Sequence, residues 1–385
     1  MLRTLAVENY RSLHSLVVPL APLTVVTGAN GVGKSNLYGA LRLLVSAARG
    51  QAVSALAREG GLPNIMWAGP ATVSRAMEKG DVPVQGGPRK GPARVRLGFC
   101  SDDYGYLIEL GMPAPSSSAF DLDPVIKREC IWHGEAWRAS ATLVDRKGSV
   151  VKRRKGRSWE LVSSHVAAHD SLLDTAGDPG TVPEVFQLRE TMRQWRFYAD
   201  FRTDADAPAR RSIPATRTPI LHHDGRDLAA ALQTIIEVGD RAALVDAIDD
   251  AFPGTELIVV PNGAGWLDAT LKQPGLLRTL GCAEWSDGTL RFVLLVAALL
   301  TPRPPPLMVL NEPETSLHPE LIAPLARLII VASQRSQVWV ISHSQELVRR
   351  LEHAEDVANH VLEKSLGRTM VSGQRKLDMP PWRWG

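Results

Sequence analysis

The sequence predicts an α/β fold built on a mixed, largely parallel sheet. Three apolar runs are typical of buried strands: residues 23–27, 307–310 and 337–341. The first run leads into a glycine-rich turn at 28–33, and a helix-compatible segment follows that turn. Strands that alternate with helices usually form a parallel sheet, whose ligands bind at the carboxyl ends of the strands. We therefore expect the polar residues after each run to lie at one edge of the sheet.

The turn after the first run has the pattern G-x-x-x-x-G-K-[ST], which binds phosphate. Its glycines let successive backbone N–H groups face a phosphate, and the following helix directs its positive dipole end to the same point. Lys34 adds a mobile cation, and the Ser35 hydroxyl can complete the coordination of Mg²⁺ between the β- and γ-phosphates. The pattern predicts binding of a nucleoside triphosphate; the alternative is a plain glycine-rich turn. Its residues are Gly28, Ala29, Asn30, Gly31, Val32, Gly33, Lys34 and Ser35.

Candidate catalytic residues follow the other two runs. The second run ends in Asn311 and Glu312, and the third in Ser342 and His343. At the carboxyl edge of the sheet, Glu312 can orient the attacking water as a general base. Taken alone, Glu312 could equally be a helix N-terminal acid before Pro313, and His343 could be a structural histidine. The order of the three strands and their polar ends favours the catalytic interpretation.

A second anion site is expected at the start of an apolar helical run at 292–300. Ser286 can cap that helix, and Gly288 lies in its first turn. Because the turn at 28–35 already holds phosphates, the second site fits a head-to-tail dimer, in which it binds the γ-phosphate held by the partner. The alternative is an ordinary helix cap with Asp287 in the first turn.

Several segments match, in order, the motifs of one known group of proteins. They are 8–13 and 22–37 for the N-terminal sheet and Walker A motif, 57–61 for an arginine loop, 286–288 for the signature, 310–314 for Walker B, 315–319 for the D-loop and 342–343 for the switch histidine. In these segments the chain resembles the ABC-type ATPase heads of the SMC, RecF and overcoming-lysogenization-defect (OLD) AAA-family ATPases.

The resemblance implies a P-loop NTPase fold of the ABC-ATPase-head type that binds ATP and Mg²⁺. It implies catalytic roles for Lys34, Glu312 and His343. The nucleotide would contact the residues of the turn, and also Asn36, Arg58, Ser286 and Gly288. The magnesium site would consist of Ser35 and, through water, Asn311.

Two positions depart from the pattern of that group. Walker B strands usually end in Asp-Glu, whereas here the first position is the neutral amide Asn311. An amide oxygen can accept a hydrogen bond from a magnesium-bound water but adds no negative charge, so we expect slow hydrolysis. Asp287 takes the place of the second glycine of the signature. The Q-loop glutamine of the group has no assigned counterpart.

The predicted organisation is one ATPase head over residues 1–385 with an inserted lobe. Residues 1–112 would form the Walker A half, 113–225 the inserted lobe or short arm, and 226–385 the half with the signature, Walker B and switch histidine. The 385 residues could hold two domains, but the Walker A and Walker B strands must join one sheet. No sustained heptad repeat appears, so long coiled-coil arms are not expected.

A cluster of basic residues suggests contact with DNA. The formal net charge of +3 is too small to indicate nucleic acid by itself, but residues 146–157 carry seven Lys or Arg. Displayed on one face, they could bind duplex DNA without sequence preference; the alternative is a solvated hairpin. The seven are Arg146, Lys147, Lys152, Arg153, Arg154, Lys155 and Arg157.

Other features bound the environment of the protein. Cys100, Cys130 and Cys282 show no metal or disulfide spacing, which indicates a reducing compartment. The N-terminus lacks a signal-peptide layout, and the longest clean apolar run, 292–300, is about half of a membrane span. We expect a cytoplasmic protein without membrane contact. The pair His222 and His223 is assigned no chemistry.

The sequence therefore predicts an ATP-hydrolysing, nucleotide-switched homodimer that acts on DNA in repair, recombination or phage defence. An alternative is a weakly hydrolysing ATP-binding switch subunit that regulates a partner effector protein, and Asn311 favours it. A transporter ATPase subunit is a third possibility, disfavoured because residues 315–319 resemble the DNA-linked branch.

Overall fold

The chain forms two compact units, which are described separately. The computed structural model describes residues 1–385 except 71–73, 85, 87–93, 116, 200, 264 and 376. The first unit comprises Met1–Ala21, Thr27–Gln194 and His360–Gly385, and the second comprises Pro22–Val26 and Trp195–Asn359. The division passes through strand β3 (Leu23–Gly28), so the chain crosses between units directly before the glycine-rich turn.

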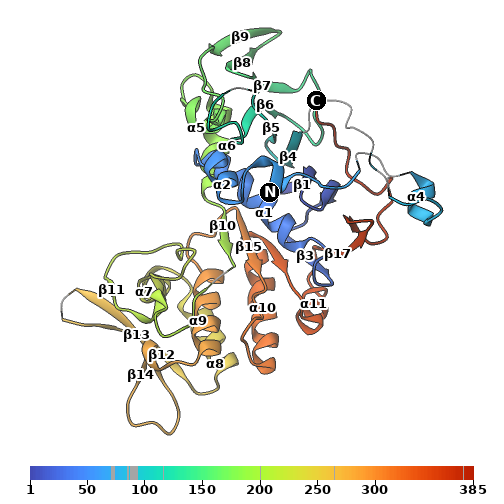
Figure 1. The fold of residues 1–385 in the computed structure, drawn as a ribbon. Coiled ribbons are helices and arrows are strands. Elements are labelled where there is room, and N and C mark those ends of the chain that lie inside the picture. The colour runs from blue at the N-terminus through green and yellow to red at the C-terminus, as the bar shows by residue number, and fades with distance from the viewer. Residues whose placement is uncertain are drawn as a thin grey trace. The chain divides into compact units, whose positions relative to one another are not determined.

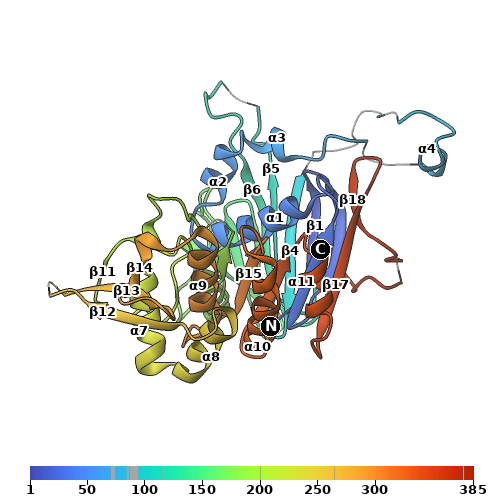
Figure 2. The ribbon, with the colours of Figure 1, turned by 90° about the horizontal axis from the view of Figure 1, so that it is seen from below.

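An eight-stranded antiparallel sheet is the framework of the first unit. The strand order is β2-β1-β4-β5-β6-β7-β8-β9, and Figure 2 shows β1, β4, β5 and β6 running side by side. Apart from the long connection before β4, the chain adds each strand beside the one before it, as antiparallel hairpins allow. The strands are β1 (Leu2–Tyr10), β2 (Leu13–Pro19), β4 (Arg94–Ser101), β5 (Gly105–Gly111), β6 (Val125–Trp132), β7 (Thr142–Lys147), β8 (Val150–Lys155) and β9 (Ser158–Ser163).

Helix α1 (Lys34–Ala48) packs against this sheet and against neighbouring helices. Its apolar residues recur at three- and four-residue spacing, as in Leu37, Leu41 and Leu44, which gives the helix a buried face. The other helices are α2 (Ala52–Arg58), α3 (Leu62–Ile65), α4 (Arg75–Lys79), α5 (Leu172–Thr175) and α6 (Pro183–Arg193). A hairpin of β17 (Val357–Ser365) and β18 (Arg368–Val371) joins the first unit through residues 360–371.

A buried ion pair fastens β6 to β7. Glu129 and Arg146 are opposite one another in the register, and both side chains are fully buried. Arg146 Nη1 lies 2.7 Å from Glu129 Oε2, and the other guanidinium nitrogens donate to backbone carbonyls, among them those of Gly148 and Ala167. Burial and the Glu129 carboxylate raise the pKa of Tyr106 well above its ordinary value. The expectation that Arg146 belongs to an exposed basic cluster is wrong, because its side chain is buried in the first unit and paired with Glu129.

The second unit contains the predicted parallel strands. The order is β10-β15-β16-β3, and the three predicted runs are β3, β15 and β16. Asn311 pairs with Ile341 and Ile341 with Val26, so the carboxyl ends of these strands lie side by side. The expected α/β class with a parallel arrangement is confirmed. The bounds are β10 (Arg196–Tyr198), β15 (Leu307–Asn311) and β16 (Gln337–Ile341).

Helix α9 (Asp287–Leu299) is the centre of the core of the second unit. Its residues from Leu290 to Leu299 are buried, as expected for a helix that is apolar on nearly all sides. Figure 1 shows α9 beside α10, and the two helices are in contact. The surrounding helices are α7 (Leu228–Val238), α8 (Arg241–Ala251), α10 (Ile322–Ser333) and α11 (Gln345–Leu351). A smaller antiparallel sheet consists of β11 (Ile213–Pro214), β12 (Glu256–Pro261), β13 (Trp266–Lys272) and β14 (Leu280–Gly281).

The segment expected to be an inserted lobe, 113–225, contributes to both units. Residues 125–163 continue the eight-stranded sheet, whereas residues 195–225 belong to the second unit. The division at 113 and 225 stays a prediction. Within the described part of the chain, none of the helices combines the length and the apolar character needed to cross a bilayer.

Candidate functional site

The glycine-rich turn between β3 and α1 is packed tightly on one side and open on the other. Gly28 and Gly33 have φ angles of 140° and 114°, which side-chain-bearing residues rarely adopt. A Cβ at Gly33 would lie 2.2 Å from Thr369 Oγ1, and one at Gly28 would lie 2.4 Å from a carbonyl oxygen of β17. A Cβ at Gly31 would meet no described atom within 4 Å. The turn is therefore packed tightly at Gly28 and Gly33 and open at Gly31.

A chain of polar contacts provides this brace. Asn36 Nδ2 donates to Ser12 Oγ at 2.7 Å, and the Ser12 hydroxyl lies 2.6 Å from Thr369 Oγ1. Thr369 Oγ1 in turn donates to the carbonyl of Val32 at 2.5 Å. Ser12 comes from the turn before β2 and Thr369 from β18, so elements far apart in sequence hold the glycine-rich turn. In this structure the Asn36 amide supports the turn from its packed side.

Lys34 and Ser35 open helix α1 with different exposures. Lys34 is 5% exposed, and its Nζ donates to the carbonyls of Gly28 and Ala29 at 2.7 and 2.9 Å. Ser35 is exposed, and the first turn of α1 contains no acidic residue that would repel an incoming phosphate. These features fit a triphosphate with Mg²⁺: the amides and Lys34 suit the phosphates, and the Ser35 hydroxyl suits the metal.

The structure places Arg58 at the end of α2, exposed to solvent. Its Nε donates to the Ser54 carbonyl at 3.3 Å, one helical turn earlier. The neighbouring Glu59 binds Arg11 Nη2 at 2.8 Å, which ties α2 to the start of the chain. A phosphate contact by Arg58 stays a prediction.

In the second unit, Glu312 and His343 are brought together at the carboxyl edge of the parallel strands. Glu312 Oε1 lies 3.2 Å from His343 Nε2, and the side chains are 42% and 37% exposed. Glu312 adopts a left-handed φ of 48°, which costs about 1–2 kcal/mol for a residue with a Cβ. Its N–H donates to the Ile341 carbonyl at 2.7 Å, and its own carbonyl accepts from Arg291 Nη2 at 3.0 Å. The strained conformation thus presents the carboxylate to the histidine.

Glu314 was missed at the sequence level, yet it organises the loop that carries His343. Its Oε1 accepts hydrogen bonds from the Ser342 hydroxyl at 2.6 Å, the His343 N–H at 2.8 Å and the Ser344 N–H at 3.0 Å. Ser344 also caps α11 through the N–H of Leu347. The spacing of two glutamates around Pro313 was a possible signal, but only the fold shows which donors Glu314 meets.

Asn311, Ser286 and Gly288 occupy the expected local positions. Asn311 is the last residue of β15 and is half-buried. Ser286 caps α9: its Oγ accepts from the Thr289 N–H at 3.1 Å. A Cβ at Gly288 would lie 2.9 Å from the Ser316 carbonyl, so the helix start packs closely on the predicted D-loop. Their contacts to nucleotide or magnesium stay predictions.

Two other groups of reactive side chains carry no chemistry that we assign. Among the described residues, His222, His223 and Asp224 are spaced closely enough to hold a metal. However, His222 Nδ1 lies 2.6 Å from Asp224 Oδ1, and His222 Nε2 lies 2.9 Å from Arg226 Nη2. Both ring nitrogens of His222 therefore have partners, and the Arg226 guanidinium already places a positive charge beside this cluster. Burial raises the pKa of each cysteine thiol to about 12, which leaves the thiols unreactive.

Comparison with known proteins accounts for this set of motifs. A family model described as "AAA domain, putative AbiEii toxin, Type IV TA system" matches residues 23–349. The chain belongs to this AAA family. The match extends from strand β3 past His343, so it includes the glycine-rich turn, Glu312 and His343, whereas Ser12 and Thr369 of the brace lie outside it. No curated protein matches the chain.

Solved structures of SMC heads are similar to this AAA-family chain. An SMC head bound to the C-terminal winged-helix domain of ScpA is 14% identical, with 96% of this chain and 97% of that chain covered and a TM-score of 0.51. The SMC head domain from Thermotoga maritima is 16% identical, with 97% of this chain and 99% of that chain covered and a TM-score of 0.45. A Pyrococcus furiosus SMC head bound to the C-terminal domain of ScpA is 14% identical, with 96% of this chain and 95% of that chain covered and a TM-score of 0.48. The first likeness shows the fold: the AAA-family chain is an ABC-type ATPase head with a P-loop NTPase fold, a class that binds nucleotides and usually Mg²⁺.

Proposed function

We propose that this chain is an ATPase head that hydrolyses ATP slowly and switches between a nucleotide-bound dimer and free subunits. The observation that carries the proposal is the Glu312–His343 pair, 3.2 Å apart at the carboxyl ends of adjacent parallel strands. A carboxylate held in a strained conformation beside an imidazole is a suitable arrangement for activating water.

In the proposed reaction, a water oxygen attacks the γ-phosphorus of ATP and the bond from that phosphorus to the β–γ bridging oxygen breaks. ADP leaves with the electron pair of the broken bond, and Glu312 accepts the proton of the water. Lys34 and the amides of the turn bind the phosphate charge. His343 holds the Glu312 carboxylate in position and responds to the γ-phosphate. Ser35 directly and Asn311 through water would hold Mg²⁺, which would supply positive charge to neutralise the phosphates.

The dimer is proposed to form head to tail, with the Ser286 cap of α9 binding the γ-phosphate held by the partner. In light scattering, Glu312→Gln with ATP should give a dimer mass, because ATP is bound but not hydrolysed. Adding Ser286→Arg should restore the monomer mass, because a bulky side chain then fills the cap. ADP in place of ATP is the control and should leave both variants monomeric. An unchanged mass for Glu312→Gln on addition of ATP would refute the dimer switch.

We propose that the protein binds and acts on DNA in repair, recombination or phage defence. The family description names a toxin of a type IV toxin–antitoxin system, which fits a defence role. On the β7–β9 hairpins, Lys147, Lys152 and Arg157 are exposed, whereas Arg153 pairs with Glu160. Reversing the charges of Lys152 and Arg157 should lower duplex affinity and reduce the salt slope by about 2. Reversing two exposed arginines of α11, Arg349 and Arg350, is the matched control. An unchanged slope would make the cluster a solvated hairpin.

A second candidate is a switch subunit that scarcely hydrolyses ATP and regulates an effector protein. The neutral Asn311 at the end of β15 favours it, since the magnesium shell then lacks its usual carboxylate. A similar SMC head was solved bound to a domain of ScpA, so binding of a partner protein fits this fold. ATP-dependent dimerisation without measurable phosphate release would favour this candidate.

A further inference from the structure

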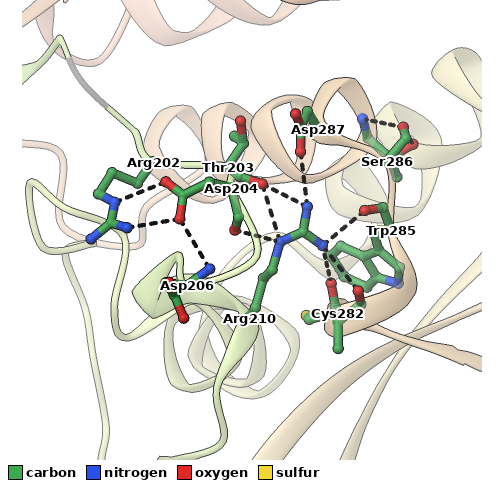
Figure 3. Close-up of polar contacts among 11 residues, drawn as sticks. Arg202, Thr203, Asp204, Asp206, Arg210, Cys282, Trp285, Ser286 and Asp287 are labelled. Carbon is green, nitrogen blue, oxygen red and sulfur yellow. Dashed lines mark hydrogen bonds and ion pairs between the residues drawn. The ribbon is translucent and has the colours of Figure 1, made fainter.

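Arg210 is locked in place beside the start of α9 (Figure 3). It ends a short 3₁₀ helix, Pro208–Arg210, and its side chain is 7% exposed. Its Nη1 donates to the carbonyls of Cys282 and Trp285 at 2.7 and 2.8 Å, and its Nη2 to that of Thr203 at 2.7 Å. Because these carbonyls occupy the planar fork, the guanidinium cannot swing away.

The loop that carries Arg210 is itself fixed. Arg202 makes a bidentate pair with Asp204, through Nε at 2.9 Å and Nη2 at 2.7 Å. The Asp206 N–H donates to the same carboxylate at 3.0 Å. Figure 3 shows the two arginines on opposite sides of this loop, with Arg210 turned toward α9.

Arg210 also contacts Asp287, the residue that departs from the signature pattern. Arg210 Nη2 lies 3.0 Å from Oδ1 of Asp287, the first residue of α9, and the Asp287 side chain is 61% exposed. An acidic residue in the first turn stabilises a helix, but it opposes an incoming anion at the same N–H groups. Without a partner, the Asp287 carboxylate would repel a phosphate approaching Ser286.

We propose that Arg210 is a positioning residue of the signature motif: it neutralises Asp287 and draws its carboxylate away, so that the start of α9 can accept the γ-phosphate of ATP held by a second copy of this chain. The inference rests on the proposed dimer. It explains how the motif tolerates an aspartate at the second glycine position. The pair is a fixed cation and an exposed anion, and its net charge of zero leaves the partial positive charge of the helix end unopposed.

A charge cycle in the Glu312→Gln background tests the proposal, with the dimer dissociation constant in ATP measured by analytical ultracentrifugation. Arg210→Gln should weaken the dimer about tenfold, because Asp287 then repels the phosphate. Asp287→Asn alone should change the constant less than about threefold. The two changes together should return the constant to within about threefold of the parent. A purely structural brace by Arg210 would give no such rescue.

Further variants keep the test decisive if Arg210→Gln fails to fold. Arg210→Lys keeps the positive charge but not the planar fork, so a folded Arg210→Lys should weaken the dimer by less than about tenfold, and a folded Arg210→Lys that loses about tenfold or more would overturn the proposal. Asp287→Asn changes an exposed side chain, and a tenfold loss from it alone would also overturn the proposal. A double variant as weak as Arg210→Gln would overturn the Arg210 inference but not the dimer. A parent that stays monomeric in ATP would overturn both.

Discussion

Replacing Glu314 by alanine tests whether the loop after β16 is held for catalysis. The substitution removes three hydrogen bonds to one carboxylate oxygen, from the Ser342 hydroxyl and the N–H groups of His343 and Ser344. Hydrogen bonds to a charged group contribute about 1.5–3 kcal/mol each, and the exposed one from His343 contributes least. Counting the two half-buried bonds at the lower value, the free energy of unfolding should fall by about 3 kcal/mol.

The catalytic effect should fall on kcat rather than on KM. A loosened loop would move the His343 imidazole out of its position beside Glu312. A displacement near 1 Å at a reacting centre costs up to about a hundredfold in rate. KM for ATP should stay within about threefold, since Lys34 and the turn are untouched. The assay is steady-state phosphate release, paired with urea unfolding.

Two variants serve as controls for this prediction. Glu314→Gln retains an acceptor oxygen without its charge and should show about half of the stability loss, because charge-assisted bonds are roughly twice as strong as neutral ones. Glu320→Ala removes an exposed carboxylate from the short 3₁₀ helix Pro319–Leu321, a few residues after Glu314, and should change stability by less than about 0.5 kcal/mol. If Glu314→Ala loses stability while kcat stays within twofold of wild type, the positioning role is refuted.

Three further perturbations address the glycine-rich turn and the magnesium site. Lys34→Ala should weaken ATP binding about a hundredfold in calorimetric titration, because the turn keeps its amides but loses its cation; near-wild-type affinity would overturn the nucleotide site. Gly33→Ala should lower ATP affinity and stability more than Gly31→Ala, because a Cβ at 33 would lie 2.2 Å from Thr369 Oγ1 and one at 31 lies in open space; equal effects would contradict the brace. Asn311→Asp should lower the Mg²⁺ concentration needed for half-maximal turnover, because a carboxylate attracts the dication more strongly; an identical magnesium titration would count against Asn311 as a metal-site residue.

The local elements of the fold and site could be predicted from sequence because their signals lie close together in the chain. Residues 307–310 and 337–341 are short apolar runs bounded by turn residues, and they are strands β15 and β16. Their polar ends were expected at one sheet edge, and Glu312 and His343 are 3.2 Å apart there. The Ser286 cap follows in the same way from a hydroxyl residue before an apolar helix.

The contacts that modify the site could not be predicted, because they join residues distant in sequence. Arg210 meets Asp287 across 77 positions, and Glu314 meets His343 across 29. Neither pair leaves a spacing pattern in the chain. Arg146 illustrates the opposite error: its position within a basic stretch indicated exposure, but the register of β6 and β7 sets it against Glu129 inside the unit. Charge clusters in sequence do not show which side of a strand each residue faces.

The central claim is that Glu312 activates water for ATP hydrolysis, and phosphate release at saturating Mg²⁺ and ATP tests it most directly. Wild type should release phosphate slowly but above background, and Glu312→Gln should release none while its ATP affinity stays the same, since the amide cannot accept the proton of the water. Turnover that survives in Glu312→Gln would contradict the assignment of the base. No release from wild type, even with duplex DNA present, would contradict the hydrolytic function itself and leave the ATP-binding switch.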